Sequence, residues 1–433
     1  MSPMPKEPEH PYTKQDSQVD LILKNHPDVR RWPPDRHEDL GFLYQAGVVL
    51  VRDAYLAQVQ AILGGKVKEG DGFIDGVTVL SLEDVKENKF ENVIDAVEEI
   101  DRRLGTGIAT PNHIFWVTPV FCCPATEPEE VPLHAQPDPG VCDGGGEGVL
   151  IYVSDTGLLQ GASSAHPWLA GVSGAADMPQ VIAAGIGTIP GYAGHGTFVA
   201  GVARCMAPVS SVYVASDFDH SGAESETEIV SRLQEALRRG ADVISLSAGG
   251  FTRHHLPPLS FESFWNRYRH YKGVVMVAAA GNNSQRRPFW PAAFPQVVGV
   301  GALGANWRTR AYFSDFGPWV DVYAPGEGLV NAYATGTYVC REPPDTNQVR
   351  HFDGMARWSG TSFSTPLVSG LIAARMSRTG ENGRQAADAL LARARAQALA
   401  GVGPVLYPCG SGDDCRRRAE EWCEHCHRHC GHC

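Results

Sequence analysis

From about residue 148 the chain alternates short apolar runs with longer amphipathic stretches. The apolar runs are rich in β-branched residues and read VLIYVSD, SSVYVAS, ADVISLS and VVMVAAA, at residues 149–155, 210–216, 241–247 and 274–280. Polar and apolar positions do not alternate within them, which predicts strands buried on both faces, as in a parallel sheet. Helical patterns lie between or after these runs, at about residues 195–206, 224–239, 260–271, 362–377 and 384–397. The alternation predicts a doubly wound α/β domain with a mostly parallel sheet, whose active residues lie at the carboxyl ends of the strands.

A smaller unit precedes this domain. Two helical patterns there alternate with the strand-like segments VVLVRD, GVTVLSL and HIFWVTP, at residues 48–53, 76–82 and 113–119. The helical patterns run from Tyr55 to Leu63 and from Val93 to Leu104, and glycine follows each of them, as is common at helix ends. There is room for a further short strand near residues 72–75. This order predicts a small α+β domain of the ferredoxin-like kind.

Composition marks the boundaries between these units. The first 40 residues are polar and contain several prolines, which predicts a flexible segment. A stretch with paired cysteines, several prolines and the run GGGEG is typical of a linker. The predicted division is a flexible N-terminal segment, a small α+β domain, a linker, a large α/β domain and a Cys/His-rich tail, at residues 1–40, 41–120, 121–147, 148–400 and 401–433.

The overall composition of the 433 residues narrows the classes of protein. Hydrophobic residues make up 43% and the formal net charge is −12, which argues against a general nucleic-acid binder. The chain contains no apolar stretch near the roughly 18 to 20 residues of a membrane span. Its start, MSPMPKEPEHPYTKQDSQ, differs from the basic and then apolar pattern of a secretory signal. We therefore expect a cytoplasmic protein without nucleic-acid or membrane partners.

Four short segments carry residues suited to nucleophilic catalysis. SDTG places Asp155 at the end of a buried strand, and GHGTFVAG places His195 at the start of a helix. AAAGNN places Asn282 just after another buried strand, and SGTSFSTP places Ser362 at a strand-to-helix junction. A serine hydroxyl needs a base to accept its proton and an acid to orient that base, and the intermediate needs donors around its oxygen. The helix after Ser362 also points free N–H groups toward the reaction centre.

These segments together resemble the subtilisin family of serine peptidases, in which the chain order is also Asp, His, Ser. The resemblance covers roughly residues 147–378 and extends to SLSAGG, FSDFG and YAPG. It implies an orienting acid, a general base and a nucleophile, at Asp155, His195 and Ser362. It also implies that Asn282 and the Ser362 N–H form the oxyanion hole, and that no cofactor is needed for catalysis. The backbone edge that pairs with a peptide or protein substrate would be Ser247, Ala248 and Gly249.

The small domain resembles the inhibitory propeptide of such proteases, which implies a latent serine endopeptidase with its own N-terminal domain as an intramolecular inhibitor. An independent small domain is the alternative reading. Two other functions remain open at this stage. One is a latent peptide-binding or regulatory protein, although its signature would be a broken triad. The other is a transpeptidase or macrocyclase, in which an amine captures the same acyl-enzyme.

Two weaker patterns concern metals. The segment DFDHSGAESETE fits the calcium-loop template at Asp217, Asp219, Ser221, Gly222 and Glu228. However, a strand and not a helix precedes it. The favoured interpretation is an acidic loop followed by the start of a helix. Cysteines spaced by 3, 4 and 3 residues in the tail suggest zinc, although the two C-x-x-C pairs are closer than in a zinc ribbon. A thiol-rich disordered tail is the preferred interpretation of Cys423, Cys426, Cys430 and Cys433.

Overall fold

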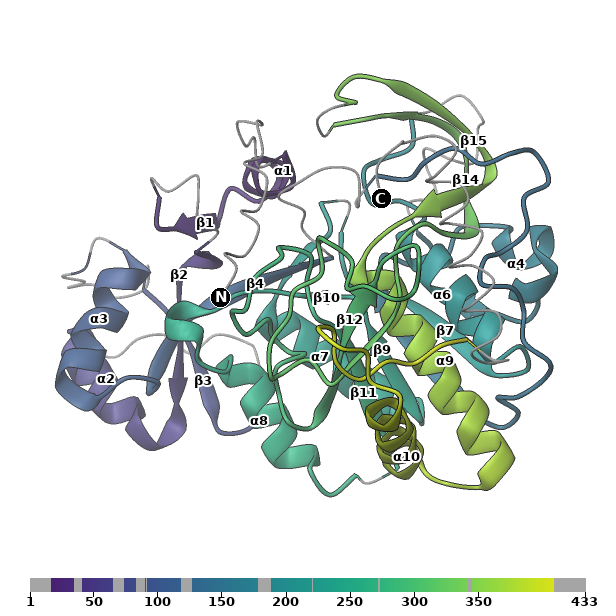
Figure 1. Ribbon diagram of the computed structural model, residues 1–433. Coiled ribbons are helices and arrows are strands. Elements are labelled where there is room, and N and C mark those ends of the chain that lie inside the picture. The colour runs from purple at the N-terminus through teal and green to yellow at the C-terminus, as the bar shows by residue number, and fades with distance from the viewer. Residues whose placement is uncertain are drawn as a thin grey trace, which may run out of the picture.

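The structure is a computed structural model, and it describes residues 17–34, 41–64, 74–82, 90, 92–117, 127–177, 188–219, 221–271, 273–341 and 345–408. Figure 1 shows most of the N-terminal elements as a smaller body at one side, with strand β4 (Ala109–Val117) running from it into the larger body. The zinc prediction and the cysteines of the tail lie outside the described residues.

The larger body is built on a parallel sheet, as the sequence predicts. Among the described residues it contains seven strands in the order β13-β12-β11-β9-β5-β7-β6. Their bounds are β5 (Leu150–Asp155), β6 (Ser173–Gly174), β7 (Ser211–Ser216), β9 (Val243–Leu246), β11 (Val275–Ala279), β12 (Val297–Leu303) and β13 (Val322–Pro325). The four strands expected from apolar runs are confirmed as β5, β7, β9 and β11.

Helices cover both faces of this sheet, which confirms the doubly wound arrangement. They are α6 (His195–Met206), α7 (Glu226–Arg238), α8 (Leu259–Tyr268), α9 (Thr361–Thr379) and α10 (Gly383–Ala396), with short turns at α4 (Ala162–Ala165) and η2 (Pro167–Leu169). Alternate residues of each strand enter different cores: Val243 packs with α6, α9 and α10, whereas Ile244 packs with α7 and α8. Strands that lie between two helical layers need apolar side chains on both faces, which explains the non-alternating runs.

The N-terminal body has the predicted order of strands and helices. It contains β2 (Phe42–Arg52), η1 (Asp53–Tyr55), α2 (Leu56–Leu63), β3 (Val77–Ser81), α3 (Val93–Leu104) and β4 (Ala109–Val117). Gly64 ends α2 in the left-handed conformation, and the Asn92 side chain caps α3 by accepting hydrogen bonds from the N–H groups of Ile94 and Asp95. Part of the predicted short strand lies outside the described residues, and Ile74 forms only an isolated bridge.

The prediction that residues 1–40 are flexible is wrong for residues 17–32. These residues form α1 (Ser17–Asn25) and β1 (Val29–Trp32), and β1 pairs antiparallel with β2. Three apolar side chains of this polar segment, Val19, Ile22 and Val29, are buried in the N-terminal core, and Leu23 and Trp32 pack against it while partly buried. Composition underestimates order here because a few apolar side chains are enough to anchor the segment.

The two bodies share one sheet. Strand β4 pairs along one edge with β2 and then with β10 (Ala248–Gly249) of the larger body, and along its other edge with β8 (Ala223–Ser225). A separate two-stranded hairpin, β14 (Leu329–Val339) and β15 (Val349–Trp358), projects from the larger body in Figure 1. A short 3-10 turn, η3 (Arg253–His255), follows β10. No helix among these described parts is both long and apolar enough to cross a membrane.

Candidate active site

Asp155 and His195 meet at the carboxyl end of the parallel sheet. Asp155 is the last residue of β5 and His195 the first of α6, and the His195 Nδ1 lies 2.7 Å from the Asp155 Oδ1. The same carboxylate oxygen accepts a hydrogen bond of 2.8 Å from the Thr156 N–H, and both side chains are buried. When Nδ1 donates to the carboxylate, Nε2 is left as the acceptor. The pair therefore holds the tautomer that a general base requires.

Ser362 is the second residue of α9, one position before Phe363, whose ring contacts the imidazole. Its Oγ donates to the Ser247 carbonyl oxygen at 3.2 Å, and the Ser247 Oγ donates to the Ser362 carbonyl oxygen at 2.8 Å. The ring of the next residue, Phe363, is 5.3 Å from the His195 ring between centroids. Within the described residues, the His195 Nε2 is buried and has no hydrogen-bond partner. Hydrogen bonds between nucleophile and base are often long in the absence of substrate and shorten in the complex.

Asn282 is held so that its amide nitrogen remains available. Its Oδ1 accepts hydrogen bonds of 2.9 Å from both the N–H and the hydroxyl of Thr361, the residue before Ser362. These two donors assign the oxygen and leave Nδ2 as a buried donor that has no partner among the described residues. A buried donor without a partner suits a site where negative charge develops during a reaction.

Asp315 braces the turn that carries Asn282, a role that sequence reasoning missed. Its Oδ1 accepts hydrogen bonds from the N–H groups of Asn283, at 2.9 Å, and Gln285, at 2.8 Å. Burial of the carboxyl raises the pKa of Asp315 to about 7. The only sequence feature that points to this role is the acidic residue within FSDFG. Its hydrogen-bond partners are about 30 residues away in sequence, so the pattern alone does not identify them.

The predicted substrate edge, Ser247–Gly249, is occupied by the N-terminal domain. Ala248 pairs with Val117 and Gly249 with Trp116, both antiparallel. On the opposite side of β4, Ser225 pairs with Ile114, and the Val117 N–H donates to the Gly222 carbonyl oxygen at 2.7 Å. β4 thus lies as an extended peptide between two backbone edges, of which sequence reasoning identified one. Ser247, which precedes β10, is the residue that Ser362 contacts.

Alternate side chains of β4 point into different bodies. Ile114 and Trp116 pack in the N-terminal core, whereas Phe115 and Val117 pack in the core of the larger body. Phe115 is 0% exposed and stacks on Phe261 with ring centroids 5.5 Å apart. A β-carbon added to Gly250 would lie 2.7 Å from the Phe115 ring, so the glycine makes room for it. This alternation follows from the two-residue period of a strand.

A buried polar contact reinforces the same interface. The His113 Nδ1 of β4 lies 2.8 Å from the Glu226 Oε1 at the start of α7. The second oxygen of Glu226 accepts the Ser260 N–H at 3.1 Å, and the His113 Nε2 accepts the Arg253 N–H at 3.1 Å. Every polar atom of this pair therefore has a partner, which a buried pair requires to be tolerated.

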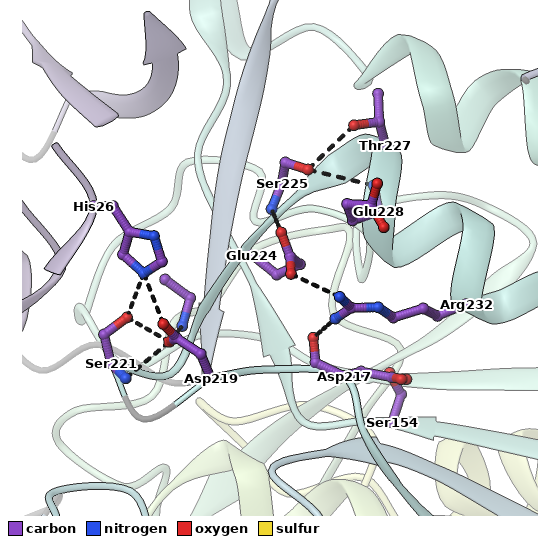
Figure 2. Close-up of polar contacts among 11 residues, drawn as sticks. His26, Ser154, Asp217, Asp219, Ser221, Glu224, Ser225, Thr227, Glu228 and Arg232 are labelled. Atoms are coloured by element: carbon purple, nitrogen blue, oxygen red, sulfur yellow. Dashed lines mark hydrogen bonds and ion pairs between the residues drawn. The ribbon is translucent and has the colours of Figure 1, made fainter. Parts of the chain in front are cut away.

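Figure 2 shows the acidic loop that fits the calcium template. The Asp219 Oδ1 accepts the N–H and hydroxyl of Ser221, at 2.8 and 2.6 Å, and the Asp219 Oδ2 lies 3.0 Å from the His26 Nε2. The Asp217 carboxylate accepts the Ser154 hydroxyl at 2.5 Å, and burial raises the pKa of Asp217 to about 6. The carboxylates of the loop diverge toward separate protein partners (Figure 2). No group of three or more His, Cys, Asp or Glu side chains that could hold a metal occurs among the described residues. The calcium prediction therefore gains no support from these contacts.

Comparisons with known proteins agree with this geometry. A family model described as the subtilase family matches residues 146–412. Thermitase of Thermoactinomyces vulgaris is 32% identical over 256 residues, which are 56% of this chain and 81% of thermitase. Subtilisin DY of Bacillus licheniformis is 31% identical over 198 residues, covering 43% of this chain and 64% of that relative. A thermophilic serine proteinase of Bacillus sp. strain AK1 is 33% identical, and the match covers only 43% of its length.

A solved structure extends the likeness in fold to the N-terminal part of the chain. Fervidolysin from Fervidobacterium pennivorans, described as a keratinolytic enzyme related to subtilisin, aligns with a TM-score of 0.56 at 18% identity. The alignment covers 89% of this chain and 62% of fervidolysin. At that identity the likeness concerns the fold alone.

Proposed function

The chain belongs to the subtilase family, and from that premise we propose that it is a serine endopeptidase kept latent by its own N-terminal domain. One observation carries the catalytic part of the proposal. His195 is fixed to Asp155 through Nδ1, while Asn282 keeps a buried amide donor that no described residue pairs with, beside the turn that leads to Ser362. This arrangement combines an oriented base with a donor where a tetrahedral oxygen would develop.

The reaction follows from these positions. The Ser362 Oγ attacks the carbonyl carbon of the substrate, and the His195 Nε2 accepts its proton. The oxygen of the tetrahedral intermediate accepts hydrogen bonds from the Asn282 Nδ2 and the Ser362 N–H. His195 then gives the proton to the leaving amine, and a water molecule attacks the acyl-enzyme in the same way. Asp155 stays ionised and stabilises the imidazolium through the 2.7 Å contact.

The position of β4 supports the latency. The strand occupies both backbone edges that an extended substrate would use, so domain and substrate compete for one groove. The interface also buries Phe115 and the His113–Glu226 pair. The substrate we propose is accordingly an extended segment of a peptide or protein.

Labelling with a fluorophosphonate tests the proposal. The full-length chain, Ser362→Ala and Ser364→Ala are compared by intact mass before and after limited proteolysis. Ser364 is the matched control because its hydroxyl is also buried in α9 but donates to the Ala324 carbonyl oxygen at 3.0 Å. We expect labelling of the wild type and Ser364→Ala, and none of Ser362→Ala. Absence of labelling in every form of the wild type would instead favour a peptide-binding protein.

A further inference from the structure

The base of the β14–β15 hairpin lies directly against the proposed general base. Trp358, the last residue of β15, stands at 88° to the His195 ring, with centroids 5.3 Å apart. Trp358 is buried, and its ring also lies 5.3 Å from that of Phe363, which contacts His195 from α9. The imidazole is therefore in contact with two aromatic rings that come from different elements.

Tyr333 of β14 holds the backbone on which His195 is mounted. Its ring is 5.5 Å from that of Trp358, and a β-carbon added to Gly194 would lie 2.9 Å from it. Gly194 has a φ of 84°, so both its backbone conformation and the Tyr333 ring require glycine there. The hairpin changes register between Ala332 and Thr335, and irregularities of this kind re-aim a side chain beside a site.

The hairpin itself is held in place by the segment that follows the N-terminal domain. Glu129 and Arg357 exchange two backbone hydrogen bonds of 2.8 and 2.9 Å, one residue before Trp358. Asp138 and Val330 exchange two more, of 2.9 and 3.0 Å, on the other strand. At the same end of the hairpin, the Gly328 N–H donates to the Ser359 Oγ at 2.9 Å and so closes its base next to the nucleophile turn. The base of the hairpin is thus attached through both of its strands.

We infer that Tyr333 and Trp358 are positioning residues for His195, an inference that rests on the proposed peptidase function. The 2.7 Å contact with Asp155 fixes only one edge of the imidazole, and a ring held at one edge can still swing about its side-chain bonds. Trp358 and Phe363 occupy the space into which it would swing, and Tyr333 supports Trp358 and the turn at Gly194. The aromatic rings therefore hold Nε2 in its orientation relative to Ser362. They also keep water from the buried Asp155–His195 contact.

The test compares three single variants in the full-length chain. Trp358→Leu removes the ring, Trp358→Phe keeps an aromatic ring, and Phe352→Leu is the control. Phe352 is a buried aromatic residue of the same hairpin that contacts Tyr333, with centroids 4.9 Å apart, and has no ring contact with His195 among the described residues. The thermal midpoint of each variant reports any general loss of stability.

Two readouts are used. The first is the rate of fluorophosphonate labelling after limited proteolysis has released the N-terminal domain, separated into a binding constant and a maximal rate. We expect Trp358→Leu to lower the maximal rate about 10²-fold with little change in binding, since small misplacements of a catalytic group have costs of that order. Trp358→Phe should restore most of the rate, and Phe352→Leu should leave it unchanged.

The second readout does not require activity. The proton shared between the His195 Nδ1 and Asp155 should give a proton resonance far downfield of the amides. Asp155→Asn identifies it, and His113→Gln removes the resonance expected from the other buried pair. We expect exchange with water to broaden this resonance in Trp358→Leu and not in Trp358→Phe. If the wild type is labelled neither before nor after limited proteolysis, the proposed function fails and this resonance alone decides the inference. An unchanged rate and resonance in Trp358→Leu, or equal losses in all three variants, would overturn it.

Discussion

Removing the Phe115 ring should release the N-terminal domain from the groove. The side chain is fully buried, but its neighbours, including Phe261, belong to the larger body and not to the N-terminal core. Truncation of a buried phenylalanine to alanine costs about 3 to 5 kcal/mol. The ring has few contacts within its own domain. The substitution should therefore mainly reduce the free energy with which the N-terminal domain binds to the larger body. About 3 kcal/mol corresponds to a shift of about 10²-fold from the closed toward the open form.

The assay is the initial rate of fluorophosphonate labelling of the full-length chain. Since only the open form exposes Ser362, Phe115→Ala should raise this rate by up to about 10²-fold. Gly250→Ala disturbs the same contact from the larger body. Its new β-carbon would lie 2.7 Å from the Phe115 ring and 3.2 Å from the Ile114 carbonyl oxygen. Arg102→Gln, on the exposed face of α3, is the control and should change nothing. A wild type labelled as fast as Phe115→Ala would refute the idea that β4 blocks the groove.

Two further predictions concern the loop around Asn282. Asn282→Ala should lower kcat about 10² to 10³-fold with little effect on KM, as loss of one such donor does in subtilisin; a kcat within a few-fold of the wild type would show that its Nδ2 is not an oxyanion donor. Burial raises the pKa of Asp315 to about 7, above the value of an unfolded chain, so the stability it contributes is complete below about pH 4 and lost as pH rises to about 7. The thermal midpoint of the wild type should therefore fall as the pH rises from about 4 to about 7, and Asp315→Asn should reduce that fall. The same pH dependence of the midpoint in both proteins would contradict a buried neutral carboxyl.

The sequence predicts the central strands and the candidate triad because each depends on local information. An apolar run such as VVMVAAA indicates a strand buried on both faces, whichever strands it pairs with. The three candidate catalytic residues lie at the ends of strands or helices: Asp155 ends a strand, and His195 and Ser362 lie at the starts of helices. The edge of the sheet at which they meet therefore follows from the direction of the strands.

The groove could not be predicted because it depends on distant pairing. Strands β8 and β10 have three and two residues, and such lengths carry no periodicity that could predict a strand. Both exist because β4, more than 100 residues earlier, pairs with them. The orientation of the Asn282 amide likewise depends on the two donors of Thr361, which no spacing in the sequence reveals.

The double pairing of β4 has a consequence for the choice of substrate. A chain that enters the groove must offer backbone hydrogen bonds on both of its sides at once, as β4 does. In a helix or in the middle of a sheet those groups are already bonded, so a helical or sheet segment of a native protein can enter only after it unravels. The rate at which such a protein is cut then depends on how often that segment opens. On this view, the stability of the target, as much as its sequence, decides what is degraded.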